Sequence, residues 1–177
     1  SLPICGEIVG IVGPNGAGKS SMLIACIGEF KATGTRLLYD RPIHTQLRYI
    51  TYIPQKAQLD LDFPIKVEQV VLSGCYQDIG WFKRPEITER AKLNQLLKDL
   101  ELDDLRHRQI SELSGGQLQR VLVARALMSE SDIYCFDEPF VGIDIYSEEL
   151  IMKKIKHIRH LGKLILIVHQ DLSKSQE

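Results

Sequence analysis

IVGIVGPNGAGKS, residues 8–20, is the stretch of sequence that decides the fold of this chain. Its first five residues form a continuous apolar run, which is typical of a strand buried in a parallel sheet. The next eight match the pattern G-x-x-x-x-G-K-[ST], and residues 19–27, ended by Gly28, are predicted to form a helix. A glycine-rich loop between a strand and a helix presents backbone N–H groups that bind phosphate. The sequence therefore predicts an α/β nucleotide-binding protein.

The loop is expected to hold a triphosphate. Lys19 would reach the β- and γ-phosphates, Ser20 would bind Mg²⁺, and Ser21 would add a hydroxyl at the α-phosphate. The alternative is a glycine loop without a ligand, which the flanking strand and helix disfavour. The residues predicted to bind the nucleotide here are Gly13, Pro14, Asn15, Gly16, Ala17, Gly18, Lys19, Ser20 and Ser21.

A second motif is the acidic pair Asp137 and Glu138, which ends the apolar stretch 132–136. Asp137 is predicted to hold Mg²⁺, directly or through a water molecule. Glu138 is predicted to orient and polarise the water that attacks the γ-phosphate. The alternative is an acidic pair that faces solvent, and the phosphate loop in the same α/β core favours the catalytic interpretation.

The third motif, Ser114-Gly115-Gly116-Gln117, opens a predicted helix over residues 114–127. Its two glycines lack a Cβ atom, so a phosphate can approach the backbone closely at the start of the helix. Ser114 and Gln117 also match a capping box, which satisfies free N–H groups at a helix start. A plain capped helix and a phosphate site therefore remain alternatives from local physics.

Strands and helices alternate along the chain, which favours an α/β fold with a mainly parallel sheet. We read the chain, residues 1–177, as a single domain, with a helical subdomain inserted over the helix-rich residues 56–127. The predicted strands cover 8–12, 36–39, 49–53, 132–136 and 163–168. The predicted helices cover 19–27, 67–72, 85–100, 114–127 and 147–161.

Composition limits the classes of partner. The 177 residues carry a net charge of −1, and basic residues are scattered, so binding to nucleic acid is not expected. No apolar run approaches the roughly 18–20 residues that span a bilayer. If the protein serves a membrane process, we expect it to do so through a partner.

The three motifs together resemble those of the ATP-binding-cassette (ABC) ATPases, and the resemblance covers nearly the whole chain. It implies hydrolysis of ATP with Mg²⁺, in a homodimer or paired cassette that sandwiches two nucleotides. In such a pair, residues 114–117 contact the γ-phosphate held by the opposing subunit. The resemblance also implies that Gln55 senses Mg²⁺ and the attacking water, and that Asp144 belongs to the D-loop. The expected partner is an integral membrane permease, at the cytoplasmic face of the cell membrane.

Residues 60–64, 80–85 and 138–144 more closely resemble the importer ATPases for manganese, zinc or iron. The segment 74–85 corresponds to the region that meets the permease in this family. Its aromatic residues Tyr76, Trp81 and Phe82 suit such a contact. Covering the core of the helical subdomain is an equally favoured alternative for them.

The sequence departs from the family at two places. No aromatic residue precedes Gly13, so the usual adenine platform is missing, and we expect the chain to be truncated at both ends. Gln170 stands where the family has its switch histidine, with His169 one residue early. Glutamine donates a hydrogen bond but carries no proton charge, so we predict weakened hydrolysis. The predicted catalytic residues are Glu138, Gln55 and Gln170. The alternative function is a nucleotide-binding but hydrolytically weak or remnant cassette.

Overall fold

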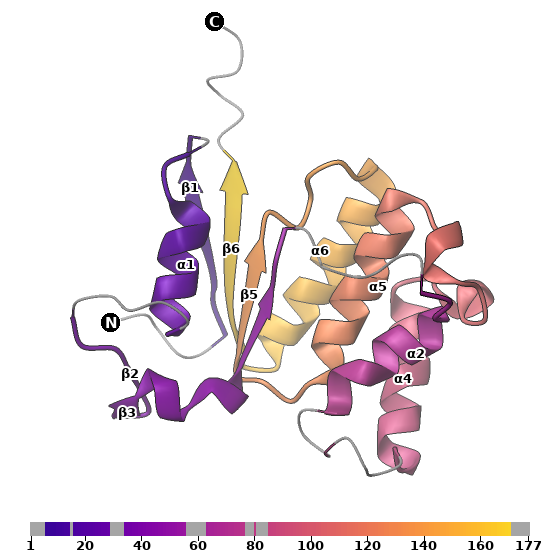
Figure 1. Ribbon diagram of the computed structural model, residues 1–177, viewed down its shortest axis with the longest axis horizontal. Coiled ribbons are helices and arrows are strands. Elements are labelled where there is room, and N and C mark those ends of the chain that lie inside the picture. Colours follow the sequence, from indigo (N-terminus) through magenta and orange to yellow (C-terminus); the bar gives the residue numbers. More distant parts are fainter. Residues whose placement is uncertain are drawn as a thin grey trace, which may run out of the picture.

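The computed structural model describes residues 6–14, 16–28, 34–55, 63–76, 80 and 85–170, and for Gln170 the backbone only. Within these residues, a parallel sheet of four strands forms the centre of the molecule, in the order β1-β6-β5-β4 (Figure 1). The strands are β1 (Ile8–Gly13), β4 (Ile50–Ile53), β5 (Ile133–Asp137) and β6 (Leu164–Gln170). The α/β fold with a parallel sheet is therefore confirmed.

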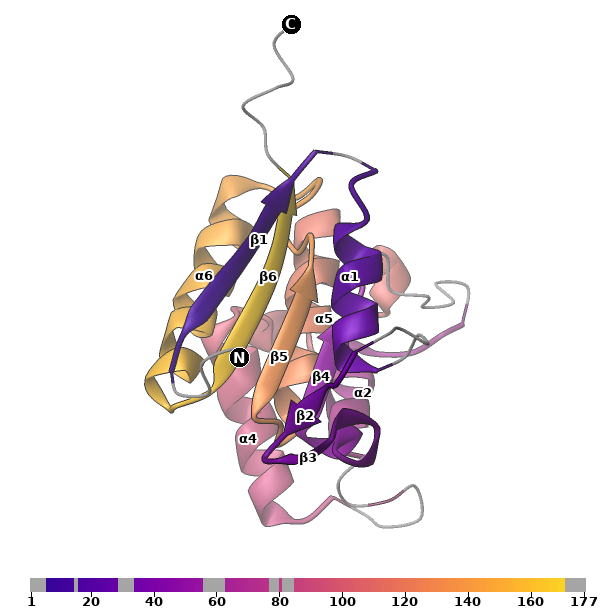
Figure 2. The ribbon, with the colours of Figure 1, turned by 90° about the vertical axis from the view of Figure 1, so that its left-hand side faces the viewer.

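The register of the sheet brings its functional ends together. Gly13 of β1 is paired with Gln170 of β6, and Asp137 of β5 with Val168 of β6. Strand β4 pairs with β5 in the same direction, so all four carboxyl ends lie at one edge (Figure 2). The phosphate loop, the acidic pair and Gln55 follow these ends and therefore meet at this edge.

Each face of the sheet carries its own core. Helix α1 (Lys19–Ile27) covers one face, and its Leu23 and Ile27 pack on Cys135 and Leu166 (Figure 1). Helices α5 (Gly115–Met128) and α6 (Ile145–His160) cover the other face. Because side chains alternate along a strand, one residue of β5 faces α1 while the next faces α5 and α6.

Two further helices, α2 (Val67–Leu72) and α4 (Ile87–Asp99), pack with α5 through buried leucines and valines. Helix α5 also packs on α6 and β4, so it joins the helical part to the sheet. Residues 56–62, 77–79 and 81–84 lie outside the described part of the chain. The inserted helical subdomain over 56–127 stays a prediction.

Most predicted elements form within two residues of their expected limits, but three details differ. Helix α4 begins after Glu86, so Pro85 precedes the helix and does not lie in its first turn. Helix α6 begins at Ile145, because the Asp144 side chain caps it by accepting a hydrogen bond from the Ser147 N–H at 2.8 Å. The region 36–42 forms an antiparallel hairpin of β2 (Leu37–Leu38) and β3 (Arg41–Pro42), where a single strand was predicted.

Short 3₁₀ helices connect the main elements. They are η1 (Ile43–Thr45), η2 (Leu47–Tyr49), η3 (Ser73–Cys75), η4 (Asp103–Leu105) and η5 (Ile110–Glu112). Among the described helices, none has the length and apolar character that crossing a bilayer requires.

Candidate nucleotide site

Two glycines of the phosphate loop take a left-handed backbone conformation. Gly16 and Gly18 both have φ of 77°, in the left-handed region that side chains with a Cβ rarely adopt. Gly18 is the N-cap of α1, so the free N–H groups at the start of the helix adjoin the loop. Asn15 lies outside the described residues. The described part of the loop has the strand–loop–helix context of an anion site.

Lys19 is held over this loop by its own backbone. The ammonium donates hydrogen bonds to the carbonyl oxygens of Gly13 at 2.8 Å and Pro14 at 2.9 Å. Only 9% of the residue is exposed, although its side chain carries a full charge. A cation fixed in this way at the start of a helix makes the loop strongly attractive to phosphate oxygens.

Asp137 is the most deeply buried acidic residue of the site, with 3% exposure. Its Oδ1 accepts a hydrogen bond from the Ser20 hydroxyl at 2.9 Å, and its Oδ2 accepts one from the Tyr52 hydroxyl at 3.0 Å. A hydroxyl and a carboxylate oxygen are ligands that Mg²⁺ prefers. The pair Ser20 and Asp137, which the sequence predicted as metal ligands, is therefore brought together in the structure.

Tyr52 is the residue of this site that sequence reasoning missed. Its signal in the sequence was weak, because it is an aromatic residue with a polar tip inside a predicted strand, three positions before Gln55. Only the order of the strands shows that β4 lies beside β5, and hence that this hydroxyl can reach Asp137.

Glu138 and Gln55 form a second side-chain contact, between the segments that follow β5 and β4. The Gln55 amide nitrogen donates to Glu138 Oε2 at 2.6 Å. Glu138 itself has φ of 48°, an uncommon value for a residue with a Cβ, and its N–H bonds the Val168 carbonyl at 3.0 Å. Backbone strain of this kind persists where the surrounding structure enforces it, and it gathers at functional sites.

The phosphate loop, Gln55 and Glu138 line one cavity of about 650 Å³, and Asp137 and Tyr52 lie behind its lining. The phosphate loop contributes backbone N–H groups, the Lys19 ammonium and hydroxyls to its lining, and the segments after β4 and β5 contribute the Gln55 amide and the Glu138 carboxylate. A triphosphate fits the first set of groups, and a water molecule held by a carboxylate fits the second. The lining residues are Gly16, Gly18, Lys19, Ser20, Ser21, Gln55, Glu138 and Val141.

The segment 114–117 does not line this cavity. Ser114 caps α5 as predicted, since its hydroxyl accepts from the Gln117 N–H at 3.3 Å and its own N–H bonds the Gln117 side-chain oxygen at 3.0 Å. Helix α5 lies on the sheet face opposite to α1, which follows the phosphate loop (Figure 1). Within one chain, these four residues therefore form a capped helix start, separate from the phosphate cavity.

The glycine at position 116 is required by packing between two helices, which the sequence did not reveal. A Cβ atom at this position would lie 2.2 Å from Asp144 Oδ2 and 2.5 Å from the Ser147 hydroxyl. Asp144 accepts hydrogen bonds from the N–H and the hydroxyl of Ser147, both at 2.8 Å, and these bonds hold the pKa of its carboxyl below the usual value. The start of α5 and the start of α6 are thus packed directly on one another.

The ring of His169 lies beside Phe140. Its ring packs edge-on against Phe140, with 6.4 Å between the ring centroids, and it is not among the residues that line the cavity. Phe140 belongs to the core on the α5 and α6 face. The backbone of the next residue, Gln170, pairs with Gly13 at the beginning of the phosphate loop. Residue 170 is therefore in backbone register with the first residue of the phosphate loop, and its role as the switch position stays a prediction.

The chain matches a known protein family and two curated relatives. Residues 4–141 match the family model described as ABC transporter. The chain is 45% identical over 172 residues to the manganese transport system ATP-binding protein MntB of Halalkalibacterium halodurans, covering 97% of this chain and 69% of that protein. It is 43% identical over 173 residues to the zinc transport system ATP-binding protein TroB of Treponema pallidum, covering 97% of this chain and 65% of that protein.

A solved structure has a similar fold. The structure of cbiO1 from Clostridium perfringens, part of the ABC transporter complex cbiONQ, matches with a TM-score of 0.78 and 30% identity. The match covers 94% of this chain and 68% of that one. Like the sequence relatives, cbiO1 is longer than this chain, and this chain spans about two thirds of the length of cbiO1.

Proposed function

Because this chain belongs to the ABC transporter family, we propose that it binds and hydrolyses ATP to power a membrane permease for a divalent metal ion. The observation that carries this proposal is the single cavity that Lys19 and Ser20 line together with Glu138 and Gln55. The names of the two relatives support manganese or zinc as the ion, and resemblance to the same subgroup adds iron. We propose that the transporter takes up the ion and that this chain lies at the cytoplasmic face of the cell membrane.

Each residue has a distinct task in this mechanism. Lys19 and the loop N–H groups bind the phosphates and stabilise charge on the γ-phosphate as its bond breaks. Ser20, Asp137 and Gln55 would hold Mg²⁺, which neutralises the phosphate oxygens when it is bound. Glu138 orients the attacking water and takes up its proton, and Gln55 holds the Glu138 carboxylate in place at 2.6 Å.

A second copy of the chain is expected to complete the site. The segment 114–117 lies outside the phosphate cavity of its own chain, so it can meet a nucleotide only on another subunit. Val141, an apolar residue that lines the cavity, is 50% exposed. Large exposed apolar side chains favour an interface. We therefore propose a homodimer or a paired cassette.

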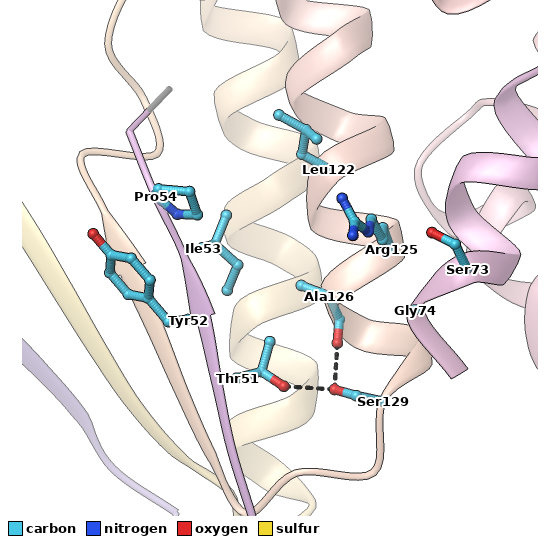
Figure 3. Close-up of a pocket in the computed structure, with 10 residues that line it drawn as sticks. All are labelled: Thr51, Tyr52, Ile53, Pro54, Ser73, Gly74, Leu122, Arg125, Ala126 and Ser129. Atoms are coloured by element: carbon cyan, nitrogen blue, oxygen red, sulfur yellow. Dashed lines mark hydrogen bonds between the residues drawn. The ribbon is translucent and has the colours of Figure 1, made fainter. Parts of the chain in front are cut away.

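A groove between β4 and α5 supports a contact with the permease (Figure 3). It is a cavity of about 280 Å³, lined on one side by Ile53 and Pro54 and on the other by Leu122 and Ala126. Gln55 follows Pro54 in the sequence, so an occupant of the groove would adjoin Gln55. Gly74, in the segment predicted to meet the permease, also lines it, whereas Trp81 and Phe82 lie outside the described residues.

The chemistry of the groove points to an acidic group on the permease. Arg125 projects from α5 into the groove, and among the described residues no carboxylate bonds its guanidinium (Figure 3). A cation beside an apolar groove fits a short amphipathic helix that carries one carboxylate.

Replacing Arg125 with glutamate is expected to weaken permease binding at least about tenfold, since like charges would then face one another. ATP hydrolysis by the isolated protein should change less than about twofold, because Arg125 does not line the nucleotide cavity. Pull-down affinity with the purified permease measures the effect. Arg90→Glu, on the exposed surface of α4, is the matched control and should bind normally. Normal binding by Arg125→Glu would contradict the proposed contact.

The proposed function as a whole is tested by reconstitution with the neighbouring permease in liposomes. We expect Mn²⁺ or Zn²⁺ to accumulate only when ATP is present, and Lys19→Ala to abolish accumulation because it removes the phosphate-binding cation. Hydrolysis of ATP without movement of either ion would contradict the metal substrate. Failure of the isolated protein to bind ATP would contradict the nucleotide site itself.

A further inference from the structure

Both oxygens of the Asp137 carboxylate are held by hydroxyl groups from different elements. Ser20 of α1 bonds Oδ1 at 2.9 Å, and Tyr52 of β4 bonds Oδ2 at 3.0 Å. With only 3% of the residue exposed, solvent has little access to replace either bond. The plane of this carboxylate is therefore set by two donors, one of which has no task in the mechanism described above.

The Tyr52 hydroxyl is itself well placed to act as a fixed donor. Its ring is half-buried and packs on the core between the sheet and α1, in the same cluster as Cys135 and Leu23. Tyr52 pairs with Cys135 across the sheet, two residues before Asp137, so its side chain extends along the same face toward the carboxylate. The hydroxyl is thus carried by a ring held in the core.

Tyr52 also belongs to a pattern. The adjacent residues Asp137 and Glu138 at the end of β5 each accept a hydrogen bond from the β4 side, from Tyr52 and from Gln55 respectively. These two bonds tie the carboxyl ends of the neighbouring strands together. A shift of β4 would therefore move the donors of both carboxylates at once.

We infer that Tyr52 is a positioning residue for the Mg²⁺ of the nucleotide site. By holding Oδ2, it orients the Asp137 carboxylate so that Oδ1 remains beside the Ser20 hydroxyl, and these two groups would hold the cation. Hydrogen bonds to a ligating carboxylate commonly tune metal affinity in this way. The inference rests on the proposed Mg²⁺·ATP site and adds a residue that does not itself touch nucleotide or metal.

The test is Tyr52→Phe, which removes one oxygen atom and keeps the ring in the core. Mn²⁺ serves as a paramagnetic substitute for Mg²⁺, and its binding with a non-hydrolysable ATP analogue is followed by electron paramagnetic resonance. We expect Mn²⁺ affinity to fall about tenfold, the lower end of the usual effect of a group behind a metal ligand. Affinity for the nucleotide analogue without cation should stay within about twofold, because the loop and Lys19 are unchanged.

Two comparisons make the result specific. Tyr49→Phe removes a hydroxyl that bonds Arg48 at 2.7 Å, just before the same strand, and should leave Mn²⁺ affinity unchanged. Ser20→Ala removes a predicted ligand and should weaken Mn²⁺ binding more than Tyr52→Phe does. The inference would be overturned if Tyr52→Phe bound Mn²⁺ as tightly as the wild-type protein does. It would also be overturned if the affinity of this variant for the nucleotide without cation fell as much as its Mn²⁺ affinity. If the wild-type protein bound no Mn²⁺ with the nucleotide, the proposed site itself would be wrong.

Discussion

Replacing Glu138 with glutamine is expected to lower the rate of ATP hydrolysis by roughly 10²–10⁴-fold. The amide keeps the size of the side chain but cannot take up the proton of the attacking water. Binding of ATP should remain, because the loop and Lys19 hold the phosphates and Glu138 is not part of the loop. Steady-state phosphate release and nucleotide affinity, measured on the same preparation, separate the two effects.

The matched control is Glu149→Gln on α6, where the carboxylate is exposed and lies outside the cavity. It removes the same charge and should leave hydrolysis within about twofold of the wild-type rate, as is usual for a surface change. Hydrolysis by Glu138→Gln at the wild-type rate would contradict the role of Glu138 as the residue that activates water. Loss of ATP affinity in that variant would instead assign Glu138 to binding.

Replacing Gln170 with histidine is expected to raise ATP hydrolysis about tenfold in the protein assembled with its permease. A hydrogen bond from a charged donor contributes about 1–1.5 kcal/mol more than one from a neutral amide, and about 1.4 kcal/mol corresponds to a factor of ten in rate. Histidine can carry that charge near neutral pH. The affinity for ATP should change little, because the gain arises as charge develops on the γ-phosphate.

His169→Gln provides the comparison for this experiment. The His169 ring packs on Phe140 and does not line the phosphate cavity, so its loss should leave the rate of hydrolysis within about twofold. An absence of gain in Gln170→His would contradict the assignment of position 170 as the switch. A large loss in His169→Gln would transfer that role to His169.

Much of the site could be predicted because its chemistry is local in the sequence. The loop 13–20 and the acidic pair 137–138 are short, and each follows a recognisable apolar strand. Their spacing fixes backbone geometry within a few residues, as the left-handed Gly16 and Gly18 show. The capping box of Ser114 and Gln117 was likewise visible, because both partners lie within one helical turn.

Contacts between distant segments could not be predicted in the same way. The sequence explained Gly116 by close approach of a phosphate, whereas the structure adds the packing of Asp144 and Ser147 against it. The bond from Tyr52 to Asp137 joins residues that are 85 positions apart. Neither contact leaves a pattern in the sequence, because which elements become neighbours depends on the packing of the whole sheet.

The sequence by itself determined the kind of ligand, since local spacing dictates a phosphate loop after a strand. The tertiary structure alone decided which groups act together. It placed β4 beside β5, so that Tyr52 and Gln55 reach Asp137 and Glu138, and it turned the His169 ring toward Phe140. The physical reason is that the order of the strands is set by burial of two separate cores, which no single segment encodes.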